Sequence, residues 1–234
     1  MKRLSFTSLI FAVAFSVLSM APPLLNKQFG FYPLIKVGDV VDIFTPLILI
    51  PLYWLLFRLD RDKTPGFTGI LIFLLFAALW VEGQGMHLAA NSIHHLLEGF
   101  EGNDAYRLTY FYDEVISHYM WHLGVFGLSM LVIIRQLRNP FADDHPIWWV
   151  VILAGVIHGF TLFVIVVEAG TAPLGVTYAI VVTLFGCIWG WKRFHYQPML
   201  LFFVITCLVA TLFFIGWGIY WGGLPEFSEV GIID

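Results

Sequence analysis

Charged residues are scarce in this sequence. Asp, Glu, Lys and Arg make up only 12% of its 234 residues, whereas 59% are hydrophobic and the mean hydropathy is +0.85. A soluble domain has roughly twice that share of charged residues, so a soluble globular protein is excluded. The 12 Lys and Arg residues lie in short clusters between apolar runs. They form no basic surface, which excludes DNA and RNA as partners.

Cysteine is also scarce. The two cysteines, Cys187 and Cys207, both lie inside apolar runs. This placement is typical of small buried hydrophobic residues, and it excludes a disulfide framework and a thiolate metal site.

Apolar runs of about 20 residues, each long enough to cross a bilayer, occupy nearly the whole chain. Turn residues and charges separate seven such runs, and the connections are too short for another domain. We therefore predict an all-α fold: a polytopic integral membrane protein in which residues 1–234 form one domain, a bundle of seven transmembrane helices. The predicted spans lie near residues 5–25, 40–57, 67–97, 109–134, 147–169, 174–191 and 198–221.

The first span also has features of a secretory signal peptide. It follows Met1-Lys2-Arg3 and ends in the small-residue sequence Ser19-Met20-Ala21. Pro22 directly after that sequence argues against cleavage. We expect this segment to be retained as a helix.

The distribution of basic residues predicts the orientation. In a seven-span chain nine Lys and Arg residues fall on the side of the N-terminus and three on the other side. Because cytoplasmic loops carry the excess of basic residues, we predict a cytoplasmic N-terminus and a periplasmic or extracellular C-terminus. The nine are Lys2, Arg3, Arg58, Arg61, Lys63, Arg135, Arg138, Lys192 and Arg193, and the three are Lys27, Lys36 and Arg107.

The second half of the third span is too polar to face lipid. His87, Asn91 and His94 share one stripe of a helix there, because a seven-residue step returns within about 20° of the same direction. The adjacent His95 points elsewhere, so either His94 or His95 faces the site. Polar side chains inside membrane spans normally face the bundle interior and are candidates for function.

The fourth span carries a second stripe. Glu114, His118 and His122 follow at four-residue steps, which drift by only about 40° per step on a helix. A carboxylate and two imidazoles on one face form half of a metal site, since imidazole suits zinc, iron and copper. Asp113 precedes this stripe directly. The sequence therefore predicts metal ligands here.

Depth along the helices places the predicted ligands together. At 1.5 Å per residue, His87, His118, His122 and the fifth-span His158 all lie about 14–20 Å below the outer surface. We predict that these imidazoles, with His94, bind a transition metal (zinc, iron or copper), and that the site opens outward. Asp39 and Asp42 are expected to line its mouth, whereas His145 and His195 lie in inner loops.

One hypothesis is a metal-dependent hydrolase whose partners are membrane lipids or another hydrophobic small molecule. Three of these imidazoles would hold the metal and leave a position for water. Glu114 or Asp113 would act as general base, and Ser92 or Asn91 would stabilise the developing oxyanion.

Two alternatives stay open. A membrane oxidoreductase would use iron, copper or haem at the same histidines, and the nearby Tyr112, Tyr119 and Trp121 favour it. A proton-coupled transporter would use the His and carboxylate residues as a relay, and a structural membrane subunit would use them as a polar network. The inner halves of the spans have almost no ionisable residues that could complete a proton path.

The helix count, the chain length and the set of Ser, Asp and His residues resemble the seven-helix intramembrane metal hydrolases that include alkaline ceramidases and the progestin and adiponectin receptors. Those families take a His-x3-His pair from the last helix, whereas here His118 and His122 supply it in the fourth span. Membrane desaturases resemble this chain only in being His-rich, since their His-x2-His-His boxes are absent. No residue role is carried over from these families.

Overall fold

A computed structural model describes residues 2–31, 35–59, 64–97, 99–141 and 145–232. The described residues are mostly helical and contain no β-strand, only an isolated bridge between Gln28 and Lys36. Within them, seven helical segments are long and apolar enough to span a membrane, which confirms the predicted all-α seven-helix bundle. This architecture satisfies the backbone hydrogen bonds inside each segment, as the bilayer core requires.

The helices keep close to the predicted spans. The fourth span differs most: it begins at residue 104, ends at residue 138, and consists of α4, the π-helix η2 and α5. The spans are α1 (Lys2–Met20), α2 (Val37–Arg58), α3 (Phe67–Leu96), α4 (Asp104–Tyr110) with η2 (Phe111–Ser117) and α5 (His118–Arg138), α6 (Trp148–Glu168), α7 (Ala172–Phe185) with η3 (Gly186–Gly190) and η4 (Trp191–Tyr196), and α8 (Pro198–Trp221). A short 3-10 helix, η1 (Pro22–Leu24), follows α1.

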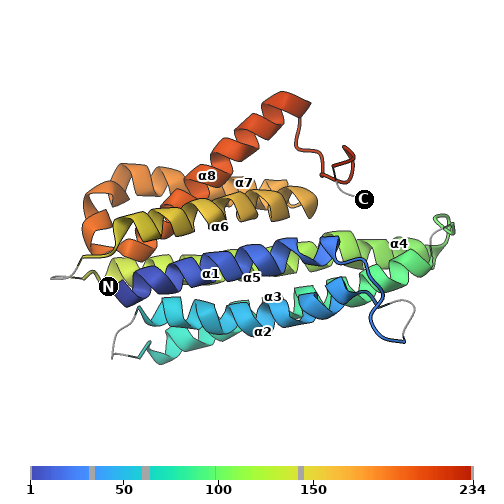
Figure 1. Cartoon of the computed structure of the whole chain (residues 1–234), viewed down its shortest axis with the longest axis horizontal. Coiled ribbons are helices and arrows are strands. Elements are labelled where there is room, and N and C mark those ends of the chain that lie inside the picture. The colour runs from blue at the N-terminus through green and yellow to red at the C-terminus, as the bar shows by residue number, and fades with distance from the viewer. Residues whose placement is uncertain (1, 32–34, 60–63, 98, 142–144, 233–234) are drawn as a thin grey trace.

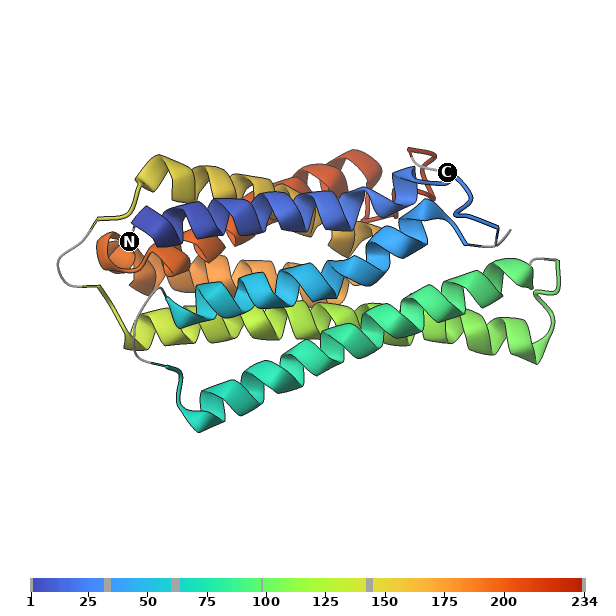
Figure 2. The ribbon, with the colours of Figure 1, turned by 60° about the horizontal axis from the view of Figure 1, so that its bottom comes forward.

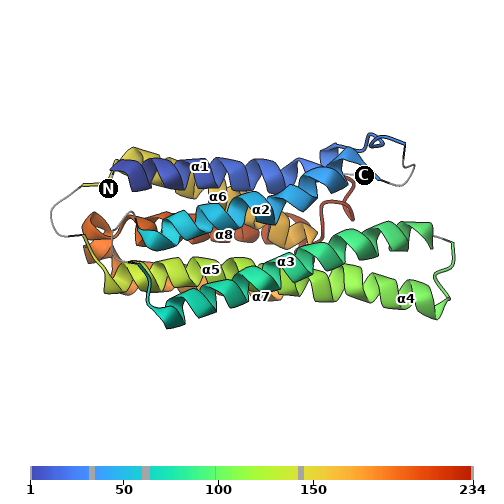
Figure 3. The ribbon, with the colours of Figure 1, turned by 90° about the horizontal axis from the view of Figure 1, so that it is seen from below.

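The chain begins at one end of the bundle, and the segment after α8 lies at the other (Figure 1). We call these the N-end and the C-end. The turn between α6 and α7 and the end of α3 lie at the C-end, as the turned views show (Figures 2 and 3). α6 packs against α1 and α8, and α3 packs along α5. These contacts bring the polar half of α3 against the start of the α5 segment.

Glycine allows that close approach. A Cβ atom added at Gly83 of α3 would lie 2.5 Å from the backbone nitrogen of Trp121 and 2.7 Å from the carbonyl oxygen of Ser117. Any side chain at this position would therefore separate α3 from α5. Small residues at helix crossings are a general device of membrane proteins, where close backbone packing drives association.

Aromatic side chains fill the middle of the bundle. Phe11 of α1 contacts Tyr53 of α2 and Phe202 of α8 with ring centroids 4.5 and 6.1 Å apart. Tyr53 in turn packs edge-on against Trp80 of α3 at 5.9 Å. These buried rings lie nearer the N-end than the polar residues of α3 and η2, which belong to the C-end half.

Candidate metal centre

A π-helix positions the acidic residues of the fourth span. η2 interrupts the α-helical hydrogen bonding between Phe111 and Ser117, and π-segments inside helices are frequent at functional sites. The Ser117 hydroxyl donates a hydrogen bond to the carbonyl oxygen of Asp113 within this segment. Because a π-turn contains more residues than an α-turn, side chains here leave the simple four-residue stripe.

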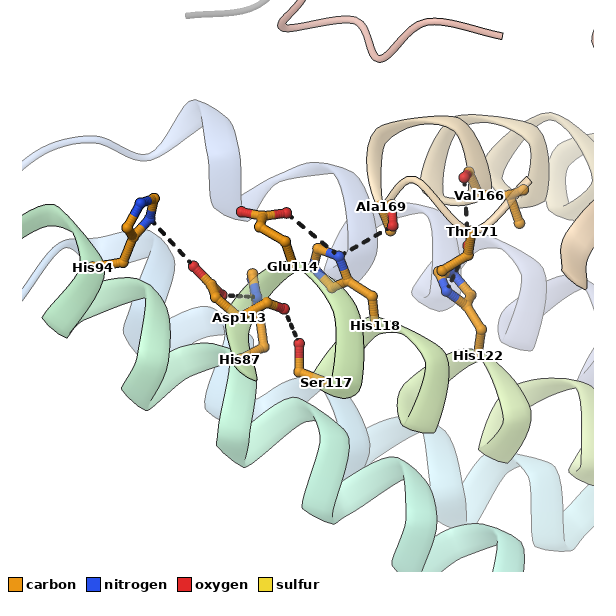
Figure 4. A network of polar contacts seen from close by, with 10 residues as sticks. All are labelled: His87, His94, Asp113, Glu114, Ser117, His118, His122, Val166, Ala169 and Thr171. Carbon is orange, nitrogen blue, oxygen red and sulfur yellow. Dashed lines mark hydrogen bonds and ion pairs between the residues drawn. The ribbon is translucent and has the colours of Figure 1, made fainter. Parts of the chain in front are cut away.

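The result is a buried carboxylate between two histidines of α3 (Figure 4). Asp113 is completely buried. Its Oδ1 lies 2.8 Å from Nδ1 of His87, and its Oδ2 lies 3.8 Å from Nδ1 of His94. His87 and His94 reach the same carboxylate because a seven-residue step places them on one stripe of α3.

The contact between His87 and Asp113 is electrostatic in character. The two atoms lie 2.8 Å apart and form an ion pair when the imidazole is protonated. Among the described residues neither Asp113 oxygen accepts a hydrogen bond. A buried carboxylate in this state is costly, since burial of charge without full pairing removes its hydration. Asp113 is therefore suited to binding a cation.

Three side chains form a group that could hold a metal ion: His94, Asp113 and Glu114. One ligand atom from each lies within 4.8 Å of the other two. Asp113 is buried, and the other two are partly buried. A small movement of the side chains would bring the three atoms to the separations that a shared metal ion requires. The donor set is one imidazole and two carboxylates, rather than the three imidazoles expected from the sequence.

His118 connects Glu114 to the turn between α6 and α7. Its Nδ1 lies 3.1 Å from the carbonyl oxygen of Ala169 and 3.7 Å from Oε2 of Glu114. A carbonyl oxygen only accepts hydrogen bonds, so Nδ1 carries the proton and Nε2 has a free lone pair in the neutral ring. The His118 ring also lies beside that of His87, with centroids 4.8 Å apart.

His122 contacts the same turn one helical turn further along α5. Its Nδ1 lies 3.0 Å from Oγ1 of Thr171, whose hydroxyl donates to the Val166 carbonyl at 3.4 Å. The Thr171 hydroxyl thus links the His122 ring to the backbone of α6. Nε2 of His122 has no hydrogen-bond partner within the described part of the chain. Stacked rings of Trp121 and Phe126 enclose it at 4.8 and 5.6 Å.

His158 lies away from this group. It is buried in a cage of phenylalanines from α1 and α8, where its ring contacts Phe11, Phe15 and Phe202 at 5.2, 4.6 and 5.5 Å. The prediction that four imidazoles converge is wrong for His158. Depth along a helix does not fix the direction in which a side chain points, and His158 faces α1 and α8 instead of α3.

The other predicted residues are distributed as follows. Asn91 lines a cavity beside the site, whereas the Ser92 hydroxyl donates to the Leu88 carbonyl of its own helix at 3.0 Å. The side chain of His95 lies outside the described residues. His145 and His195 are both exposed at the N-end; His145 lies in a loop as expected, whereas His195 lies in the 3-10 helix η4.

A cavity of about 580 Å³ opens at the C-end beside the metal-capable group. Glu114 and His118 line it, together with Asp39 and Asp42, as the sequence predicts for a site mouth. The segment after α8 covers part of it: Phe227 donates its backbone N–H to Glu168 Oε2 at 2.8 Å.

The same segment brings Glu226 to the cavity wall. Partial burial raises the pKa of Glu226 from 4.5 to about 7, and the nearby carboxylates of Glu114, Glu229 and Glu168 contribute in the same direction. Negative charge is thus concentrated at this end of the bundle.

Sequence reasoning missed Ala169, Thr171 and Glu226. No local motif marks the first two, which lie in the turn between α6 and α7 and meet the histidines of α5 only in the folded chain. Glu226 lies in an acidic C-terminal segment of the sequence, but its position at the cavity depends on how that segment folds back against the end of α6. Comparisons with protein-family models, with curated proteins and with solved structures give no match for this chain.

Proposed function

We propose that this protein is an integral membrane metal-dependent hydrolase whose divalent metal is bound by His94, Asp113 and Glu114. The observation that carries the proposal is the proximity of their three ligand atoms, within 4.8 Å of one another. Ionisable residues inside membrane spans are expensive and are normally functional. A divalent cation would neutralise both carboxylates and remove the cost of burying Asp113.

The neighbouring histidines support this donor set. His87 lies against the Asp113 oxygen that is further from His94, and His118 lies against Glu114. Such outer contacts orient ligands and raise metal affinity in known metal sites. The proposal thus gives His87 and His118 supporting roles instead of the ligand roles that spacing alone predicts.

Three protein ligands would leave a position for water, and a bound zinc ion would lower the pKa of that water to about 7. Glu114 is the proposed ligand that also lines the cavity, so a metal ion held by it would adjoin the cavity. His118 lines it as well, and its free Nε2 can accept a proton from an attacking water. Hydrolysis of a bond in an amphiphile within the cavity is the reaction that this arrangement suits.

The ligand types restrict which metal ions the site can bind. One imidazole and two carboxylates suit Zn²⁺, Mn²⁺ or Fe²⁺, whereas Cu⁺ prefers thiolate and thioether ligands. An oxidoreductase is a second candidate because two tyrosines flank the proposed ligand: the rings of Tyr106 and Tyr110 lie 4.8 and 5.4 Å from that of His94. An absorption spectrum separates the two, since a zinc protein is colourless.

Elemental analysis of protein purified without chelators tests the proposal. We expect about one metal ion per chain in the wild type, and most of it lost in His94→Ala, Asp113→Asn and Glu114→Gln. His145→Ala and His195→Ala remove exposed imidazoles and serve as controls with unchanged metal content. A wild-type protein without metal, or equal metal in all five variants, would overturn the proposal.

A further inference from the structure

An apolar groove adjoins the acidic cavity. It has a volume of about 580 Å³ and lies between α6 and the C-end half of α8. Its lining includes Leu212, Phe213 and Tyr220, which are exposed on the protein surface and therefore face lipid in a membrane. Phe160, Val164 and Phe227 line both the groove and the cavity, so the two spaces share a wall.

The cavity itself carries an excess of negative charge. Five carboxyl groups and one ammonium group line its described wall, namely Asp39, Asp42, Glu114, Glu168, Glu226 and Lys36. Three of the carboxyl groups have other roles. Asp39 accepts a backbone N–H at 2.7 Å, Glu168 accepts another at 2.8 Å, and Glu114 belongs to the proposed metal group. Asp42 is contacted by the uncharged polar side chains of Gln84 and Thr45, which leave its charge in place, and Glu226 lies beside other carboxylates. Both therefore suit a positively charged molecule.

A residue of the same wall has a buried hydrogen-bond donor without a partner in the described residues. Trp121 lines the cavity and is 9% exposed, and its Nε1 has no hydrogen-bond partner in the described residues. A buried indole N–H usually has an acceptor. An oxygen atom close to the head of a bound amphiphile would supply one after a small rotation of the indole ring toward the cavity.

We propose that the cavity and the groove together bind a single-chain cationic amphiphile, with its ammonium head beside Asp42 and Glu226 and its hydrocarbon chain in the groove. The inference names the substrate class of the proposed hydrolase and rests on that function for its catalytic meaning. An ammonium group that leaves water needs carboxylate partners. The chain would enter sideways from the bilayer and remain in an apolar environment throughout.

Gly216 offers a direct way to block the groove. It lies in the lining of the groove, and a Cβ atom added there would meet no atom within 4 Å. Gly216→Leu therefore fills the groove without disturbing the helix contacts. Gly85 of α3 is a matched control, because it is exposed, equally free of neighbours and outside both spaces.

The test measures binding of radiolabelled dodecylammonium to the full chain in phosphatidylcholine nanodiscs, after subtraction of binding to empty nanodiscs. We expect saturable binding of about one molecule per wild-type chain. Dodecanoate tests the charge of the head, and butylammonium tests the chain. Both should bind at least about tenfold more weakly, the change expected from losing one charge-assisted interaction or more.

Variants then assign the binding to this site. The double variant Asp42→Asn with Glu226→Gln and the single variant Gly216→Leu should each weaken dodecylammonium binding about tenfold or more, whereas Gly85→Leu should bind as the wild type does. Equal binding of dodecanoate, or unchanged binding in both site variants, would overturn the inference.

Metal content measured on the same samples keeps the two proposals distinct. Binding of dodecylammonium without bound metal would overturn the metal centre and leave the amphiphile site in place. Bound metal without specific dodecylammonium binding would overturn the amphiphile site alone.

Discussion

Nδ1 of His87 lies 2.8 Å from Oδ1 of Asp113, across the close contact between α3 and the π-helix of the fourth span. The carboxylate is completely buried, and its second oxygen faces His94 at 3.8 Å. His87 thus holds one oxygen of Asp113 and leaves the other directed toward the proposed metal position. This relationship explains how a carboxylate can be kept ready for a cation inside the membrane.

Replacement of Asp113 by Asn should remove most of the stabilisation that zinc gives to the folded chain. In the wild type, zinc at about 100 times its dissociation constant should stabilise the folded chain by about 2.7 kcal/mol, since only the folded state presents the ligands together. Asp113→Asn should lose most of this gain while still folding, because the change removes a buried charge. Melting curves with zinc and with a chelator measure both effects. Asp104→Asn, at an exposed position of α4, should keep the wild-type response, and a full zinc response in Asp113→Asn would contradict the assignment.

Gly83→Ala should destabilise the protein and weaken metal binding together. The added Cβ atom would lie 2.5 Å from the Trp121 backbone nitrogen, and backbone atoms cannot rotate away as a flexible side chain can. Overpacking of this kind costs about 1–3 kcal/mol. It would also separate His87 and His94 from Asp113. Gly85→Ala on the same helix meets no atom within 4 Å and should melt as the wild type does. Melting temperatures and metal contents of the two variants and the wild type, measured in one detergent, test this prediction.

Glu226 should make stability depend on pH in metal-free protein. Its pKa is about 7 in the folded chain against 4.5 as its ordinary value. The folded state therefore binds this proton more tightly, so the stabilisation is complete below about pH 4.5 and is lost as the pH rises through 7. Between pH 5 and pH 8 the melting temperature of chelator-treated wild type should fall more than that of Glu226→Gln. Identical pH profiles for the two proteins would show that Glu226 is not held in this environment.

The basic residues predict that the site faces away from the cytoplasm. In the seven-span sequence nine Lys and Arg residues fall on the side of the N-terminus and three on the other side, and cytoplasmic loops carry the excess. A reporter fused after the last residue should be active only outside the cytoplasm. The same reporter fused within the connection between α2 and α3 should be active only in the cytoplasm. Cytoplasmic activity of the first fusion would reverse the orientation and place the cavity toward the inner leaflet.

The seven spans could be predicted because length and apolarity decide which segments cross a bilayer. The stripe of His87 and His94 on α3 followed from helical period alone, and the structure places both at one carboxylate. These features depend on residues within one helix, which the sequence displays directly.

The arrangement between helices could not be read in the same way. The four-residue stripe assumes an α-helix from Glu114 onward, whereas the structure has the π-helix η2 up to Ser117. The contact between Glu114 and His118 that the stripe predicts is present at 3.7 Å, but the approach of Asp113 to the histidines of α3 could not be inferred from it. His158 has the right depth but points into a phenylalanine cage. Packing against α1 and α8 sets the rotation of α6 about its own axis. This rotation cannot be inferred from the residue spacing within α6.

X-ray absorption at the zinc edge, on purified protein loaded with one zinc ion per chain, tests the central claim most directly. We predict a first shell of one imidazole nitrogen with two carboxylate oxygens and water, at about 2.0–2.2 Å. The outer-shell scattering of a second and third imidazole should be absent, and Glu114→Gln should reduce the oxygen count or the occupancy. A shell of three or more imidazoles would contradict the donor set of His94, Asp113 and Glu114.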